Sequence, residues 1–564
     1  MDDSLLNAQC ASVDGAALMR HIGAFAQWIK LSGSAGEADS LRYVRAQLDG
    51  IGFRTRMLSH DAYISLPGSS RVQVDNRVLA SITHSFSRAA GVTGELVHVG
   101  AGNEADFAGR DLAGCIVLVD GIATPPVARR ASRAGAVGQL HISPHEHLHE
   151  MCISPVWGNP SAETLSELPA TVVCSVLLSD GAALRDRLAR GERPSVALHA
   201  EVDTGWRKTP ILEAELDAPG AGGDAPFVLF SGHHDTWYYG VMDNGSANAA
   251  MLEVSRLCAA RREHWKRGLR LCFWSGHSHG RYSGSTWYVD EHWDELDRRC
   301  VTHINIDSPG AEGADILANV GSMSELRALA GEAITEQSGQ TLLGKRMSRG
   351  ADQSFNGVGL PAIFGDISEP VPTPVGAHCW WWHTPDDLAD KISEKNLMRD
   401  TRIYMHAVWR LLTDTVLPLD YAAYAQDLLE ELDRLHTALG QRLSLDDLAA
   451  GAVTLRDNAA RLASLAGQAD DREAACINRA LMRMSRALVP IDYTSGDRFA
   501  HDPALAQPAW PTLQTLRELA AAAPGSDAAK FLTVSAIRAR NRVAHALRQA
   551  NKAAEAVVRC CSPQ

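Results

Sequence analysis

The stretch FVLFSGHHDTWYYGVMDNGSANAAMLE, residues 227–253, indicates the fold class of this chain more directly than any other segment. Its first residues are apolar or small and predict a buried β-strand, and its last residues are typical of a helix. His233 and Asp235 therefore follow a strand, and Asp243 comes shortly before a helix. Loops at the carboxyl ends of parallel strands meet at one edge of a sheet, so this stretch predicts a ligand site there. A loop histidine with a helix-capping acid would give the same pattern, and the stretch alone does not decide between the two.

Strand-like and helical segments alternate through residues 205–415. The strand-like segments are FVLFSG, GLRLCFWSG, CVTHINIDS and LPAIFGDIS, and the helical segments are SANAAMLEVSRLCAARR and MSELRALAGEAITEQSG. This alternation predicts an α/β fold with a largely parallel sheet. Outside this region, the first 50 residues are helical, and residues 86–204 contain short β-rich runs broken by Gly and Pro. Residues 416–564 are rich in Ala and Leu and predict a helical part.

The composition excludes several classes of protein. The chain has 54 Lys and Arg against 67 Asp and Glu, a formal net charge of −13, which argues against a nucleic-acid partner. No run approaches the roughly 18 apolar residues of a membrane span, and MDDSLLNAQC at the start lacks the apolar core of a signal peptide. The 11 cysteines are scattered and odd in number, as expected for reduced thiols. We therefore expect a cytoplasmic protein without a membrane partner.

Two further strand ends carry side chains that can bind metals. Asp307 ends the strand-like segment CVTHINIDS, and His383 stands where a loop meets the helix start Thr384-Pro385. Together with His233 and Asp243, these residues would bring two histidines and two aspartates to one sheet edge. Such a set can hold one divalent ion, or two ions that share a carboxylate.

The order of these motifs resembles the dinuclear zinc peptidases of the glutamate carboxypeptidase II and transferrin receptor type. The motifs are His233-x-Asp235, Asp243-Asn244, Asp307-Ser308 and His383-Thr384-Pro385. The resemblance implies an α/β fold with a mixed zinc-peptidase sheet, formed by residues 1–85 and 205–415. It also implies that residues 86–204 are an inserted protease-associated domain. Residues 416–564 would be a helical domain through which the chain forms a homodimer.

The resemblance also implies a role for each motif residue. His233 and Asp307 would bind one metal ion, Asp243 would bridge two ions, and His383 would bind the second. Asp235 would orient His233 and increase its basicity. Zinc is the metal that the family uses, as one or two ions, although a site of His and Asp alone would also suit Mn, Fe or Ni.

One motif departs from the family pattern. After the strand-like LRLCFW the family has two adjacent glutamates, a general base followed by a ligand of the second metal, but residues 275–285 read SGHSHGRYSGS. One register places His277 at the base position and Ser278 at the ligand position. The other places Ser278 at the base position and His279 at the ligand position. If the segment is extended, His277 and His279 share a face, which favours His279 as the ligand and His277 as the proton carrier.

Other interpretations remain open at this point. The site could have decayed, leaving a non-catalytic scaffold like the transferrin receptor, or it could hold a single ion. The stretch His145–His149 contains H-E-x-x-H, the zincin signature, but Pro144 and the β-rich surroundings argue against the helix that a zincin needs. The stretch would instead be a solvated loop or a loop over the active site. The run Trp380–Trp382 is either a core stripe or an aromatic wall for a substrate.

The substrate can be argued only by comparison with the same family. Glutamate carboxypeptidases bind the terminal glutamate through a Lys-Tyr pair and an arginine, and the corresponding positions here fall near Ala504-Leu505 and Thr124. None of these side chains can bind a carboxylate through a positive charge. We therefore expect a metal-dependent hydrolase of an amide or peptide bond in a small or peptide-like substrate, which uses water activated by the metal. An ordinary aminopeptidase is the alternative enzyme.

Overall fold

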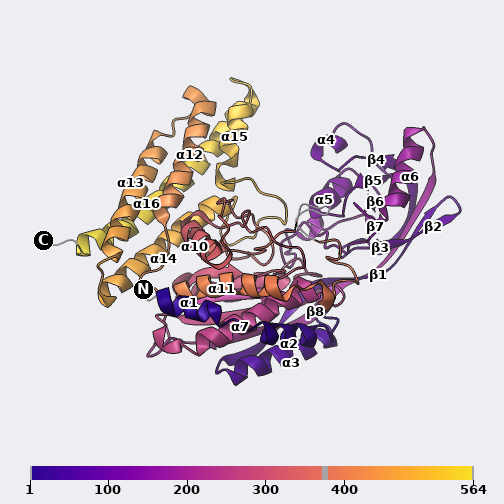
Figure 1. Ribbon diagram of the computed structural model, residues 1–564. Helices are drawn as coiled ribbons and strands as arrows, with labels where there is room; N and C mark the ends of the chain where they lie inside the picture. The colour runs from indigo at the N-terminus through magenta and orange to yellow at the C-terminus, as the bar shows by residue number, and fades with distance from the viewer. Residues whose placement is uncertain (1–2, 371–378, 562–564) are drawn as a thin grey trace.

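The computed structural model describes residues 3–370 and 379–561, and its strands form one twelve-stranded mixed sheet (Figure 1). The strands are β1 Arg54–Val74, β2 Arg77–Leu79, β3 Ser81–Thr83, β4 Ala90–His98, β5 Ile116–Asp120, β6 Gly138–Ile142, β7 Val172–Val176, β8 Ser195–Leu216, β9 Phe227–His233, β10 Gly268–Trp274, β11 Cys300–Asn305 and β12 Ala362–Ile363. Their order is β12-β11-β9-β10-β8-β4-β5-β6-β7-β3, with β1 paired to β8 and β2. The predicted α/β fold with a mixed sheet is confirmed.

Helices cover this sheet and make up most of the C-terminal part. The α-helices are α1 Asp3–Ala11, α2 Gly15–Phe25, α3 Ala35–Gly50, α4 Glu104–Phe107, α5 Pro125–Arg133, α6 Leu178–Ala189, α7 Ala247–Ala259, α8 Ser283–Glu291, α9 Trp293–Arg299, α10 Arg327–Ser338, α11 Glu394–Thr413, α12 Tyr421–Leu439, α13 Asp446–Ala466, α14 Asp471–Tyr493, α15 Gln514–Ala521 and α16 Asp527–Cys561. In the described residues, no helix is long and apolar enough to cross a membrane.

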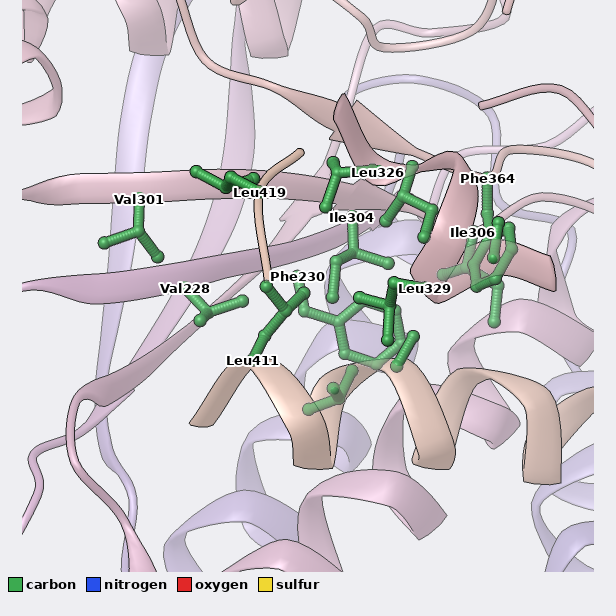
Figure 2. Close-up of a cluster of buried hydrophobic side chains, with 14 of the residues drawn as sticks. Val228, Phe230, Val301, Ile304, Ile306, Leu326, Leu329, Phe364, Leu411 and Leu419 are labelled. Carbon is green, nitrogen blue, oxygen red and sulfur yellow. The ribbon is translucent and has the colours of Figure 1, made fainter. Parts of the chain in front are cut away.

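Strands β9, β10 and β11 form the centre of the sheet in the part made by residues 1–85 and 205–415. They run parallel to one another, and every residue in them is buried, as expected for strands covered on both faces. The alternation of side chains in β9 sends Val228 and Phe230 to one hydrophobic cluster, and Phe227 and Leu229 to another. Figure 2 shows part of the first cluster, where Val228 and Phe230 face the helix α11 that carries Leu411. This packing fixes the strand that ends at His233.

A long antiparallel ribbon of β1 and β8 joins the part made by residues 205–415 to the β-rich part, residues 86–204. Strands β1 and β8 pair along most of their length. The remaining edge of β8 pairs with β4 near the start of β8 and with β10 near its end. Strand β8 therefore passes through residue 204, which the sequence suggests as a domain boundary. Residues 201–208, EVDTGWRK, are mostly polar and remain at least partly exposed within the ribbon, so they carry little of the apolar alternation by which a strand is recognised.

The β-rich part and the C-terminal helices lie at the upper right and upper left of Figure 1, with α7 and α11 below and between them. Strands β4, β5, β6 and β7 are parallel and, together with α5 and α6, form the β-rich part at one side. Helices α12–α16 pack against one another at the other side. The identities of residues 86–204 as a protease-associated domain and of 416–564 as a dimerisation domain stay predictions.

Candidate metal centre

The structure brings four predicted ligand residues together at the carboxyl edge of the sheet. His233 is the last residue of β9, and Asp243 lies in the turn Val241–Ser246 that leads into α7. Asp307 follows the end of β11, and His383 lies in the loop before α11. All four side chains are buried. The strand-end argument therefore places these residues correctly, although their roles stay predictions.

Asp243 lies between the two histidines. Its Oδ1 is 2.9 Å from His233 Nε2, and its Oδ2 is 3.0 Å from His383 Nε2. Asp307 Oδ1 is 3.4 Å from the same His233 nitrogen. One carboxylate with an oxygen toward each histidine is the arrangement that a bridging ligand needs.

The hydrogen bonds of the two histidines leave both Nε2 atoms available to a metal. His233 Nδ1 lies 2.8 Å from the carbonyl oxygen of Asp235, and His383 Nδ1 lies 2.7 Å from that of Glu150. A carbonyl only accepts, so both Nδ1 atoms carry the proton and donate. Metal-binding histidines are commonly oriented in this way.

An unsatisfied pair of buried atoms marks the centre of the cluster. His233 Nε2 and Asp243 Oδ1 are buried and have no hydrogen bond of acceptable geometry, although they face one another. Burial lowers the pKa of His233, but the carboxylates of Asp307 and Asp243 raise it well above its usual range. Burial acts to raise the pKa of Asp243, but His233 and His383 hold this pKa well below its usual range. The cluster thus favours a positive charge between these atoms, and its residues fit a bound divalent cation.

Asp387 and Asn244 support the segments that carry the two aspartates. The Asp387 carboxylate accepts the backbone N–H groups of Met242 and Asp243, at 2.8 and 3.0 Å. The Asn244 side chain donates to the carbonyl of Ile306 and accepts the N–H of Ser308, on either side of Asp307. Sequence reasoning missed Asp387, whose only signal is its position four residues after His383.

His277 lies beside His233 in the altered motif. The two imidazole rings stack, with centroids 3.6 Å apart and 10° between their planes. His277 Nδ1 is 2.8 Å from Oδ2 of Asp352, and the other oxygen of Asp352 accepts the hydroxyl of Ser285. Burial acts to raise the pKa of Asp352, but His277 brings it below its usual value. The ionised carboxylate therefore accepts from Nδ1, and Nε2 is the ring nitrogen that makes no contact with Asp352.

His277 could also act as a metal ligand. His233, His277 and Asp307 can each offer one ligand atom such that all three atoms lie within 4.8 Å of one another. Within residues 3–370 and 379–561 this is the one group of three that could hold a metal ion. The segment GADQSFNGVGLPAIF, which contains Asp352, resembles a family motif, but sequence reasoning gave Asp352 no role, because its partner His277 lies 75 positions away in the chain.

His279 and Ser278 lie differently from what an extended segment would give. Residues 275–282 follow β10 in bends and turns, so the period-two argument for His277 and His279 does not apply. His279 is buried against Trp237, and its Nδ1 is 2.9 Å from the hydroxyl of Ser32. His279 is outside the group of three, and its role as a ligand stays a prediction.

Asp235 contacts His233 through its backbone rather than its side chain. Its carboxylate instead accepts the backbone N–H groups of His277 and Ser278 and the hydroxyl of Ser32. The Ser278 hydroxyl is 3.5 Å from the Asp235 carbonyl. Asp235 therefore orients His233 with one group and holds the 277–278 turn with another.

The H-E-x-x-H stretch is not a zincin site. Residues 145–149 are not helical, so their histidines are not presented on one helix face. The stretch lies instead against the loop that carries His383, where His149 Nδ1 contacts the carbonyl of Trp382 at 2.5 Å. Of the two expectations for this stretch, the structure favours the loop beside the candidate site.

The three tryptophans before His383 have different surroundings. Trp381 belongs to the main hydrophobic cluster, Trp382 stacks on the His383 ring with centroids 3.6 Å apart, and Trp380 is exposed and packs against His147. The run is therefore neither a uniform core stripe nor a continuous wall.

Asp366 is a further carboxylate that sequence reasoning missed. Its backbone forms an isolated bridge with that of Asp307. The surrounding protein, and then the charges of Asp307 and Asp243, raise the pKa of Asp366 well above its usual value, although part of the residue is exposed to solvent. Asp366 therefore keeps its proton more readily than an ordinary carboxyl group at this end of the sheet.

Comparisons with known proteins show which family this chain resembles. Residues 215–408 match the model of Peptidase family M28. A protein of Arabidopsis thaliana named probable glutamate carboxypeptidase AMP1 is 22% identical over 532 residues, covering 78% of this chain and 73% of that protein. The aminopeptidase NAALADL1 of Rattus norvegicus is 32% identical over 85 residues, which cover 14% of this chain and 11% of the relative.

Solved structures show the same fold. An aminopeptidase from Aneurinibacillus sp. strain AM-1 superposes with a TM-score of 0.55 and 23% identity, over 72% of this chain and 95% of that one. A peptidase M28 precursor from Shewanella amazonensis has a TM-score of 0.58 and 16% identity, over 74% and 96% of the two chains. The resemblance inferred from the sequence motifs is confirmed at the level of this peptidase family.

Proposed function

We propose that this metallopeptidase, whose residues 215–408 form a peptidase family M28 domain, hydrolyses an amide or peptide bond in a small substrate. The observation that carries the proposal is the unsatisfied pair His233 Nε2 and Asp243 Oδ1, buried among carboxylates and 2.9 Å apart. His233, Asp243, Asp307 and His383 would hold the metal. A bound divalent ion, with zinc as the first candidate, polarises the scissile carbonyl and makes water a better nucleophile near neutral pH. The metal content per chain distinguishes one bound ion from two.

The chain's own residues position the reaction. The carbonyls of Asp235 and Glu150 fix the rings of His233 and His383, and Asp387 fixes the segment that carries Asp243. A ligand held in one orientation loses no binding energy to rearrangement when the metal enters.

His277 would carry the proton. Its Nδ1–H is held by Asp352, so its Nε2 can accept a proton from the attacking water and pass it to the leaving amine. This is the division of labour between a histidine and a buried carboxylate in other hydrolases. Asp352 would act as the positioning residue, and it has no direct contact with substrate.

Metal removal tests the proposed function. The purified protein is expected to hold about one or two equivalents of tightly bound divalent metal, and to hydrolyse amide bonds in small substrates. Simple aminoacyl anilides are the first probe, and their turnover would favour the alternative of an ordinary aminopeptidase. Treatment with a chelator should abolish hydrolysis, and added zinc should restore it. Metal is measured by plasma emission spectrometry and hydrolysis by anilide absorbance. Less than about 0.2 equivalents of metal after growth in supplemented medium would contradict the metal centre and favour a non-catalytic scaffold.

We also propose that the chain forms a homodimer through residues 416–564. Phe531, Val534 and Ile537 are 76%, 50% and 36% exposed and lie at three-residue spacing on one face of α16. Wild-type protein is expected to sediment as a dimer, and Phe531→Glu should shift it toward the monomer. Arg548→Glu, also exposed on α16, serves as the control. A wild-type monomer at micromolar concentration in the ultracentrifuge would refute the dimer.

The cytoplasm is the proposed location. In the part of the chain that the structure describes, nine cysteines are unpaired, a state that suits a reducing compartment. Recovery of the native protein in an exported fraction would contradict this location.

A further inference from the structure

We propose that His149, which lies in the inserted residues 86–204, is a positioning residue that fixes the metal ligand His383. This inference rests on the proposed function, since it takes His383 to be a ligand. It concerns residues 145–150, which we call the histidine loop. No part of the proposed mechanism uses the side chains of this loop.

The histidine loop and the segment 382–383 are joined by three hydrogen bonds. His383 Nδ1 donates to the carbonyl of Glu150 at 2.7 Å, and the Glu150 N–H donates to the carbonyl of His383 at 3.1 Å. His149 Nδ1 lies 2.5 Å from the carbonyl of Trp382. Two consecutive residues of the inserted part therefore hold two consecutive residues of the catalytic part. Of the three bonds, only that of His149 uses a side chain of the loop, so it is the one that a substitution in the loop can remove.

The protons of the loop histidines can be assigned in sequence. His149 Nδ1 must donate, because a carbonyl only accepts, so His149 Nε2 accepts. The partner of His149 Nε2 is His145 Nε2 at 3.0 Å, which therefore carries a proton. His145 Nδ1 in turn accepts the backbone N–H of His147 at 3.2 Å. When both rings are neutral, each donor in this series of three hydrogen bonds has an acceptor. Burial lowers the pKa values of His149, to about 4, and of His145, which keeps them neutral.

This assignment argues against a second metal site at the histidine loop. A metal between His145 Nε2 and His149 Nε2 would displace the proton of His145 to its Nδ1. That nitrogen already faces the N–H of His147, so two donors would then oppose one another. The loop histidines are therefore better suited to hydrogen bonding than to binding metal.

The backbone of His383 requires external support. Its φ is +57°, in the left-handed region that residues other than glycine adopt uncommonly. The ring of Trp382 stacks on the His383 ring, so a hydrogen bond to the Trp382 carbonyl restrains both the backbone and the ring beneath the ligand. The contacts from the histidine loop supply this support.

The histidine loop is itself anchored in the inserted part. The Glu146 carboxylate accepts the N–H and the hydroxyl of Ser179 at the start of α6. The hydroxyl of Ser143 donates to the carbonyl of His147. On the catalytic side, the hydroxyl of Tyr238 donates to Glu150 Oε1 at 2.8 Å. The orientation of His383 thus depends on the inserted residues being docked against the catalytic part.

Metal affinity measured by chelator competition tests the proposal. His149→Ala is expected to weaken zinc binding by about tenfold and to lower kcat, as loss of a residue that orients a ligand does. His149→Asn, whose amide can donate to the Trp382 carbonyl, should bind zinc within about threefold of wild type. His147→Ala is the matched control, since its ring packs on Trp380, and it should bind zinc as wild type does.

Each outcome decides the proposal. Unchanged zinc affinity in His149→Ala would overturn it, as would equal weakening in His147→Ala. Should His149→Ala fail to fold by circular dichroism, His149→Phe fills the same space without a donor and carries the same expectation. Wild-type protein that binds no zinc would instead contradict the proposed function itself.

Discussion

Asp243→Ala is expected to release the bound metal and to lower kcat/KM by at least about 10⁴-fold. The Asp243 carboxylate is the group that faces both His233 Nε2 and His383 Nε2, at 2.9 and 3.0 Å. Its removal leaves two imidazoles without the negative charge between them. Asp243→Asn keeps the shape of the side chain but not its charge, so it should lose metal and kcat/KM to a similar extent. Metal content by emission spectrometry and anilide hydrolysis measure the two effects.

Asp386→Ala is the control for this substitution. Asp386 is an exposed carboxylate in the loop that follows His383, and it should be replaceable without loss of metal or rate. An Asp243→Ala enzyme with wild-type metal content would show that Asp243 does not bridge. In that case His233, His277 and Asp307 would be the remaining candidates for the metal site.

His277→Ala is expected to lower kcat by about 10²- to 10⁴-fold while the metal content stays at the wild-type level, the usual contribution of a general base. Asp352→Asn should also lower kcat substantially, because the amide no longer selects the Nδ1–H form of His277. His277→Glu offers a carboxylate at the same position and should recover part of the rate lost in His277→Ala.

The metal content of His277→Ala distinguishes two roles of this residue. Loss of metal would mean that His277 is a ligand, as its place near His233 and Asp307 also permits. Ser278→Ala serves as the neighbouring control. The Ser278 hydroxyl is 3.5 Å from the Asp235 carbonyl, and its backbone N–H, which Asp235 holds, is unchanged by the substitution.

The parts of the fold that sequence reasoning predicted are those with a strong local pattern. Strand β9 is a continuous apolar run, and the residues after it are polar, so both the strand and the location of His233 could be inferred. The ribbon of β1 and β8 could not, because residues 201–208 are at least partly exposed in it and show no clear alternation of apolar side chains. A strand that buries little surface has little reason to be apolar.

The residues of the candidate site also fall into those that could be placed from the sequence and those that could not. His233, Asp243 and Asp307 stand at ends of strands or just before a helix, so their meeting point follows from the order of the elements. His383 lies in a turn, because no helix starts at Thr384-Pro385 as the sequence suggested. Asp352 and Asp387 could not be assigned, because their partners are set by how distant loops fold over the sheet edge. The argument that His277 and His279 share a face does not hold, for a related reason, and the roles of the two residues stay predictions. It assumed an extended segment, and the Asp235 carboxylate instead holds a turn there.

The contacts of Ser32 with His279 and of Glu150 with His383 join residues 247 and 233 positions apart in the chain. A growing polypeptide can make the first contact only after about half of its 564 residues have left the ribosome, and the second only after about two thirds have. Contacts of such long range also form slowly during folding, because a large loop must close before they contribute. The metal centre therefore cannot be completed in a newly made molecule before residue 383 has emerged. A chain that stops before residue 383 would lack it, even with the central strands in place.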